Sequence, residues 1–232
     1  MVWKWFWALS LAALAGGGYG IYTGLWQIPD HWNPWAVLRL EEEPHWLTGH
    51  KLRRLSAEPA LCREVLETAA MRWEPVPDRV TGPGCGFTNA VRIDRTGHQI
   101  GPAFTLSCPA AVSLALWERH VVAPAAAQHL GNPVARLEHF GSYACRNVNH
   151  AAEGRRSRHA TAEALDIAGF VTSDGRRISV QRAWPQGGPE ALFLREVHQG
   201  ACRFFDAVLG PDYNAAHRDH LHLDRGPWRA CR

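Results

Sequence analysis

The chain has 232 residues, of which 46% are hydrophobic and 20% are charged, and its formal net charge at pH 7 is +3. This length suits one ordinary domain with a short N-terminal appendage, and the composition excludes an intrinsically disordered protein. Basic residues cluster at positions 51–54 and 155–158, but aromatic residues do not interleave them, so we expect no nucleic-acid partner.

The N-terminal segment 5–22 contains no charged side chain and is close to the minimum length of a membrane-spanning helix. Lys4 is the only cation ahead of this segment, which favours an N-terminus on the cytoplasmic side. We expect an uncleaved anchor over residues 1–26, because no A-x-A cleavage site precedes a polar stretch. A cleaved signal peptide is the alternative, and either one would export the rest of the chain.

Six cysteines lie between positions 62 and 231, and none of them forms a C-x-x-C pair. This spacing argues against a structural zinc knuckle or a redox motif. An even number of scattered cysteines behind an export signal predicts three disulfide bonds formed in an oxidising compartment. Spacing alone does not choose among the pairings, and buried free thiols are the alternative.

Hydrophobic periodicity and breaker residues predict the remaining elements. Residues 27–48 are rich in proline and tryptophan and indicate a stiff juxtamembrane linker, and residues 49–232 form the exported domain. The expected elements are a helix at 58–73, strands at 90–93 and 100–106, a helix at 109–130 bent or broken at Pro124, a strand at 134–139, a hairpin of strands 165–172 and 177–180, a helix at 190–209 and a strand at 220–224. This order predicts an α+β fold, in which helices pack on a small, mostly antiparallel sheet.

Metal-ligand side chains concentrate in two of these segments, at positions 157–167 and 217–224. In a strand, His220 and His222 project toward the same side, because successive side chains alternate between the two faces. Asp166 lies among apolar neighbours, and a buried carboxylate requires a partner such as a cation. If the two strands pair, Asp166 and His222 meet on one face while His159 reaches in from the preceding loop.

Two imidazoles and one carboxylate form a typical tetrahedral Zn²⁺ site whose fourth position is left for water. The sequence therefore predicts a zinc centre at His159, Asp166 and His222. The alternative is a set of ordinary solvated or core histidines, since the chain contains 13 of them.

These residues also carry a family resemblance. Ser157-x-His159 followed by Ala164-x-Asp166 resembles the S-x-H-x-x-G-x-A-x-D signature of the D-Ala-D-Ala metallopeptidases. The H-x-H pair at 220–222 resembles that of lysostaphin-type and penicillin-insensitive murein endopeptidases. The stretch 28–232 resembles the bacterial extensin-like C-terminal domain family, whose marks here are Gly141–Arg146, Asn214–Asp224 and the closing Cys231-Arg232.

The resemblance implies a Hedgehog/DD-peptidase-like fold that binds Zn²⁺ through His159, Asp166 and His222. It implies a periplasmic peptidase, anchored in the inner membrane by one N-terminal helix, that acts on peptidoglycan stem peptides or crosslinks. The alternative is a non-catalytic module that binds the cell wall or serves as a scaffold. We favour the enzyme because the ligands and the candidate bases are present together.

The same resemblance implies roles for three further residues. His220 stands beside the metal as a base or a transition-state stabiliser, and Asp219 occupies the place of the catalytic glutamate of the carboxypeptidase branch, so either one is a candidate general base. Arg146 follows the Tyr-x-x-Arg pattern of a substrate-anchoring arginine. Ala162 departs from the family pattern, because glycine is usual there, and this lowers the expectation of activity more than that of metal binding.

Overall fold

The computed structural model describes residues 2–232, and the chain divides into two compact units, one up to Val37 and one from Leu38 to Arg232. The first unit contains α1 (Val2–Tyr22), on which tryptophans and leucines are exposed. Among the helices of residues 2–232, none combines the length and the apolar character needed to cross a bilayer. The expected membrane anchor is therefore unconfirmed.

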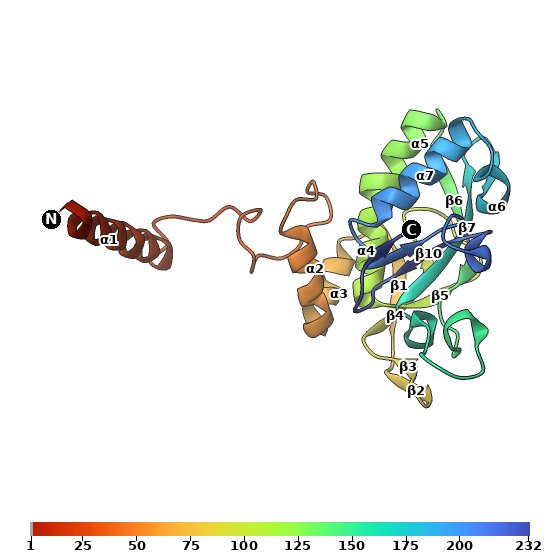
Figure 1. The fold of residues 1–232 in the computed structure, drawn as a ribbon, viewed down its shortest axis with the longest axis horizontal. Helices are drawn as coiled ribbons and strands as arrows, with labels where there is room; N and C mark the ends of the chain where they lie inside the picture. The colour runs from red at the N-terminus through yellow and green to blue at the C-terminus, as the bar shows by residue number, and fades with distance from the viewer. Residues whose placement is uncertain (1) are drawn as a thin grey trace. The chain divides into compact units, whose positions relative to one another are not determined.

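The second unit combines helices with three small sheets (Figure 1). The helices are α2 (Thr48–Ala57), α3 (Pro59–Glu67), α4 (Cys108–Trp117), the π-helical segment η1 (Glu118–Val122), α5 (Ala123–His129), α6 (Val180–Ala183) and α7 (Pro189–Ala201), with short 3₁₀ turns η2 (Val148–His150), η3 (Arg158–Thr161) and η4 (Ala215–His217). The strands are β1 (Arg72–Val76), β2 (Arg79–Gly82), β3 (Cys85–Phe87), β4 (Ala90–Arg95), β5 (Phe104–Ser107), β6 (Val134–Gly141), β7 (Ala164–Thr172), β8 (Arg177–Ser179), β9 (Ala207–Leu209), β10 (Leu221–Asp224) and β11 (Ala230–Cys231). The prediction of helices packed with small antiparallel sheets is confirmed.

The largest sheet has the strand order β11–β9–β10–β7–β6, with β8 paired to β7. Neighbouring strands in this sheet run antiparallel, except for β11 and β9, which are parallel. The other sheets are β1–β4–β5 and the two-stranded β2–β3.

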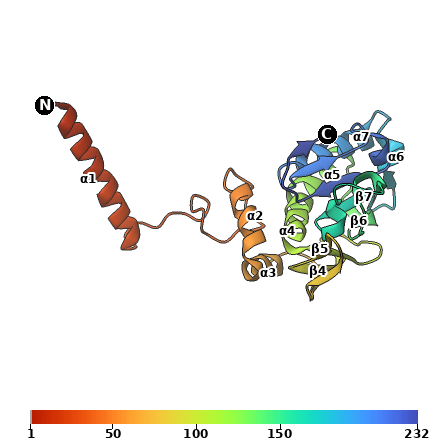
Figure 2. The same cartoon turned by 60° about the horizontal axis from the view of Figure 1, so that its bottom comes forward.

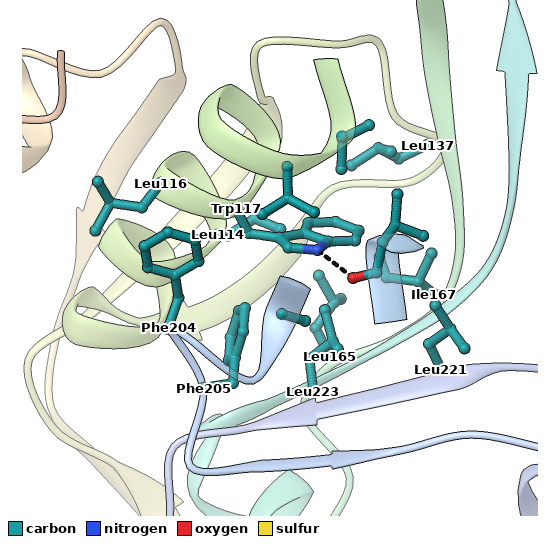
Figure 3. Close-up of a cluster of buried hydrophobic side chains, with 14 of the residues drawn as sticks. Leu114, Leu116, Trp117, Leu137, Leu165, Ile167, Phe204, Phe205, Leu221 and Leu223 are labelled. Atoms are coloured by element: carbon teal, nitrogen blue, oxygen red, sulfur yellow. Dashed lines mark hydrogen bonds between the residues drawn. The ribbon is translucent and has the colours of Figure 1, made fainter. Parts of the chain in front are cut away.

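One face of β7 and β10 forms part of the hydrophobic core. Leu165, Ile167, Leu221 and Leu223 are at most 1% exposed and lie in this core, as Figure 3 shows. Because strand residues alternate between the two faces, the polar residues that lie between these four must point to the opposite face. The apolar residues of β7 and β10 therefore place Asp166 on the face opposite the hydrophobic core.

Helices α4, α5 and α7 are grouped beside this sheet (Figures 1 and 2). The indole of Trp117 is fully buried and donates a hydrogen bond of 2.8 Å from Nε1 to the carbonyl of Val197, which joins α4 to α7 (Figure 3). Phe170 of β7 stacks edge-on against Phe193 of α7, with 4.9 Å between the ring centroids. These contacts fix the helices to the sheet.

The helix expected at 109–130, with a bend or a break at Pro124, continues past this proline as α4, η1 and α5. Proline lacks the N–H group that would donate a helical hydrogen bond to the carbonyl four residues earlier. The chain widens into η1 just before the proline, where the N–H of Ala123 bonds to the carbonyl of Glu118. Helix α7 crosses close to this segment, since a Cβ on Gly200 would lie 2.3 Å from Val121 Cγ1.

The expected helices at 58–73 and 190–209 are both too long. The first ends at Glu67 and the second at Ala201, and their last expected residues lie in β1 and β9. Strand pairing with β4 and β10 satisfies the backbone groups there, and a buried apolar residue is compatible with either structure. The strands expected at 100–106 and 220–224 also begin later, at Phe104 and Leu221.

Three disulfide bonds join Cys62 to Cys108, Cys85 to Cys145 and Cys202 to Cys231, and no cysteine of the described chain is free. The predicted oxidation of all six cysteines is confirmed. The first bond joins α3 to α4, the second joins β3 to the loop after β6, and the third joins the end of α7 to β11. Each bond closes a loop of tens of residues and so reduces the entropy of the unfolded chain.

We expect Trp117→Ala to lower the free energy of unfolding by about 3–5 kcal/mol, because it opens a cavity in the core and leaves a buried carbonyl without its donor. Leu192→Ala is the control: Leu192 lies on α7 but is 54% exposed, so its loss is expected to change stability by less than about 0.5 kcal/mol. Urea denaturation followed by circular dichroism measures both. Equal stabilities of the two variants would contradict this assignment of the core.

Candidate metal centre

Strand pairing brings Asp166 and His222 together. In the β7–β10 ladder these two residues are directly opposite each other, and Asp166 is also opposite Gly141 of β6. The ladder between β6 and β7 is irregular on both sides of His139, and such irregularities bend a strand and redirect its side chains. The β6 chain therefore turns out of the sheet beside Asp166.

His159 reaches the same place from the short turn η3, which precedes β7. The hydroxyl of Ser157 accepts a hydrogen bond from the N–H of His159 and caps this turn. Ala162 ends the turn in the left-handed region, with φ +53° and ψ +31°. A residue with a Cβ adopts this conformation at a cost of roughly 1 kcal/mol. The alanine thus holds a backbone conformation that a glycine would adopt without this cost.

His159, Asp166 and His222 form a buried triangle, with exposed fractions of 2%, 6% and 8%. His159 Nε2 lies 3.1 Å from Asp166 Oδ2 and 3.2 Å from His222 Nδ1, and His222 Nδ1 lies 2.8 Å from Asp166 Oδ1. One ligand atom from each residue falls within 4.8 Å of the others. The structure thus brings together the three side chains that the sequence predicted as ligands.

Hydrogen bonds behind the triangle set the orientation of both imidazoles. His159 Nδ1 lies 2.5 Å from the carbonyl oxygen of Ser142, so it carries the hydrogen, and the lone pair of Nε2 points into the triangle. His222 Nε2 lies 3.1 Å from Asp224 Oδ2 and likewise donates outward. A carbonyl or a carboxylate behind a ligating histidine is the usual support of a metal centre.

This donor set fits a divalent cation. Two ring nitrogens face each other beside a carboxylate, and either a proton or a metal ion must lie between such acceptors. In the metal-free protein, a proton on His222 Nδ1 lies between these acceptors. Two imidazoles and one carboxylate are ligands that Zn²⁺ prefers.

Charges inside the triangle shift two pKa values. Burial disfavours the charged form of His222, but hydrogen bonds and attraction to Asp166 and Asp224 outweigh this and raise its pKa to about 9. Burial likewise opposes ionisation of Asp166, but hydrogen bonding and positive charge at the two neighbouring imidazoles hold its pKa well below the usual range. The metal-free centre is therefore an ion pair at neutral pH.

The three other predicted site residues lie next to the triangle. His220 Nε2 is 3.5 Å from Asp166 Oδ1, and His220 Nδ1 is 2.9 Å from Asp219 Oδ1. Arg146 Nη2 approaches the other carboxylate oxygen of Asp166 at 4.0 Å. His220 and Arg146 thus approach different oxygens of the same carboxylate.

Sequence reasoning assigned no role to His217, Ser142 or Asp224. His217 Nδ1 lies 2.8 Å from Asn214 Oδ1, and burial together with the charges of His222 and His220 lowers the pKa of His217 to about 4. The spacing His217-x-x-His220-x-His222 and the alternation of His222 with Asp224 could have indicated two of these residues. The Ser142 carbonyl has no such signal, because any residue supplies one.

The triangle lies in a cleft of about 690 Å³, a size typical of ligand sites. Beyond the residues already described, Phe140, Tyr143, Tyr213 and Trp228 contribute aromatic rings to its walls, and Arg155 lies over the Trp228 ring at 5.5 Å. The cleft therefore presents aromatic rings and guanidinium groups around the three buried ligands.

The family model described as Extensin-like protein C-terminus matches residues 60–232. This range includes the whole triangle, the flanking site residues and all three disulfides. No curated protein and no solved structure matches the chain.

We expect the purified protein to bind about one zinc ion per chain. The His222→Ala variant is expected to lose the ion, because it retains only two of the three ligands. Asp224→Asn is expected to weaken zinc binding by about 10–100-fold, since it removes the carboxylate behind His222. Elemental analysis and competition with a chromophoric chelator measure the two effects. His129→Ala, remote from the triangle, is the control; equal zinc content in it and in His222→Ala would overturn the assignment of the ligands.

The raised pKa of His222 predicts a pH dependence of stability in the metal-free protein. The ion pair stabilises the fold fully below about pH 6.5, where the imidazole of the unfolded chain is also protonated, and this contribution is lost as the pH rises through about 9. The loss is on the order of 3 kcal/mol. Urea denaturation of chelator-treated protein on both sides of this range measures it. His222→Gln should not show this component, and an identical pH profile in the variant would contradict the ion pair.

Proposed function

The chain belongs to the family described as extensin-like protein C-terminus, and we propose that it is a zinc-dependent peptidase that acts on the stem peptides or crosslinks of peptidoglycan. One observation carries the proposal: one ligand atom from each of two imidazoles and a carboxylate converge at a buried point in a cleft. A purely structural zinc site would offer four protein ligands, whereas three leave one position open for chemistry.

His159, Asp166 and His222 would hold the metal, and Ser142 and Asp224 would orient the two imidazoles. When bound, zinc supplies Lewis-acid chemistry at this place, which polarises a carbonyl group and makes water more acidic. The protein's part is to bind the peptide, to direct its scissile bond toward the ligands and to move protons.

The arrangement of His220 and Asp219 supports His220 as the general base. The Nδ1–H of His220 donates to the Asp219 carboxylate, which leaves the lone pair of Nε2 directed toward the triangle. Nε2 can then take a proton from the attacking water and pass it to the leaving amine. Asp219 stabilises the protonated imidazole and holds the ring in place, as a positioning residue.

Arg146 supports recognition of a substrate carboxylate. Its side chain is 27% exposed and faces the cleft next to Asp166. The disulfide of the adjacent Cys145 and a hydrogen bond from the N–H of Ser157 to the Arg146 carbonyl hold its backbone. A guanidinium binds a carboxylate through two parallel hydrogen bonds, and stem peptides carry several carboxylates.

We also propose that the domain has the Hedgehog/DD-peptidase-like fold and lies in the periplasm, held at the inner membrane by the N-terminal segment. Three disulfides support export, because disulfides persist in oxidising compartments. A cleaved signal peptide would lead to the same compartment.

Incubation of the zinc-loaded protein with purified murein is expected to release products detectable by mass spectrometry. Free D-alanine would identify a carboxypeptidase, and separated crosslinked dimers would identify an endopeptidase. His220→Gln is expected to lower the rate by about 10²–10⁴-fold without loss of zinc, because a positioned acid–base group is removed. Asp219→Asn should cause a smaller loss.

The result that contradicts the proposal is intact murein after incubation with protein that contains its zinc. Tight binding to sacculi without any product would then favour the non-catalytic wall-binding module. Full activity of His220→Gln would reject His220 as the base while it leaves the peptidase assignment in place.

A further inference from the structure

A second cleft, of about 600 Å³, lies within the unit Leu38–Arg232. The start of α2, the turn after α7 and the segment before β11 form its walls. Its ionisable and aromatic lining residues are His45, Trp46, His50, Arg53, Arg203 and Arg229, together with Phe204. The lining shares no residue with the cleft of the metal centre.

Cations dominate this second cleft. Arg53, Arg203 and Arg229 line it, and no carboxylate does. Within residues 2–232, Arg53 and Arg203 form no ion pair, and Arg229 reaches a carboxylate only at 3.8 Å, on Asp206. The guanidinium of Arg203 instead lies over the Phe204 ring at 5.3 Å. Two guanidinium groups thus remain without a counter-charge in one concave site.

A fourth guanidinium, that of Arg225, lies outside the lining but close enough to interact with Arg53 and Arg229. Arg225 is largely buried, and its Nε has no hydrogen-bond partner and lies 3.6 Å from Asp206. Burial lowers the pKa of Arg225, and the positive charges of Arg53 and Arg229 add to this shift, while Asp206 and Glu163 oppose it. Asp206 is thus the near carboxylate of both Arg225 and Arg229.

The N-terminus of α2 adds positive charge to the arginines of this cleft. Thr48, Gly49 and His50 form its first turn and line the cleft. The N–H groups of Thr48 and Lys51 bond to the carbonyls of His45 and Leu47, and the helix N-terminus carries a partial positive charge. The backbone therefore adds to the attraction that the arginines exert on an anion.

We infer that this cleft is a binding site for a phosphate group. Several guanidinium groups that line one cleft from different segments match the three oxygens of one phosphate better than the two of a carboxylate. The phosphate can belong to a soluble ester or to the headgroup of an anionic phospholipid. Trp46 lines the cleft and is 70% exposed, and exposed tryptophans beside cations are common where proteins meet a membrane surface.

The test uses the full chain in neutral detergent, treated with a chelator so that the probe has no metal to bind. Calorimetric titration with inorganic pyrophosphate is expected to show one site that weakens as salt is added. Arg53→Glu with Arg203→Glu should weaken binding by about 100-fold, because two charge-assisted contacts are lost. Arg95→Glu with Arg182→Glu changes the net charge equally at exposed positions outside both clefts, and should bind like the wild type.

A second measurement distinguishes the two sources of phosphate. Co-flotation compares phosphatidylcholine vesicles with and without phosphatidylglycerol. An increase with phosphatidylglycerol that pyrophosphate competes away, and that the cleft variant lacks, identifies a lipid headgroup. Pyrophosphate binding without that increase identifies a soluble ligand. The inference is overturned if neither probe binds, or if the cleft variant binds like the control variant while both show native circular dichroism.

Discussion

The antiparallel pairing of β7 with β10 is the constraint on which the rest of the site depends. Leucine and isoleucine on one face of this ladder belong to the hydrophobic core, which holds the register, and Asp166 and His222 are directly opposite each other on the other face. A slip of one residue would bury the polar set and expose the apolar set, so the core energetics exclude it. The hydrophobic effect thereby positions the ligands, because the core residues alternate with them along the two strands.

The polar face of this ladder is stabilised by charge rather than by hydrophobic burial. Three buried ligands, two of them imidazoles with converging nitrogens, satisfy one another only when a cation or a proton lies between them. In the metal-free protein a proton on His222 provides this charge, which links the stability of the fold to the same side chain that would bind a metal. The supports behind it, Ser142 and Asp224, hold the rings whether the centre contains a proton or a metal.

The disulfides hold the surrounding loops next to the β7–β10 ladder. Cys85–Cys145 holds the chain just before Arg146, and Cys202–Cys231 closes the segment between α7 and β11 that includes β9, β10 and the histidines beside the metal centre. Arg203 of the second cleft directly follows Cys202, so this same bond also stabilises one wall of the proposed phosphate site. One crosslink therefore supports two clefts of different chemistry.

By itself, the sequence determined the residue classes and their alternation: the apolar and ligand positions of β7 and β10, the six cysteines behind an apolar N-terminal segment, and the His159–Asp166–His222 set. These signals are local, because strand alternation and motif spacing depend on nearby residues alone. Only the tertiary structure decided the cysteine pairing, the ends of α3 and α7, and the passage of a helix through Pro124. It also decided that the Ser142 carbonyl supports His159 and that arginines distant in sequence share one cleft. Each of these depends on a partner far along the chain, whose contacts outweigh local propensity.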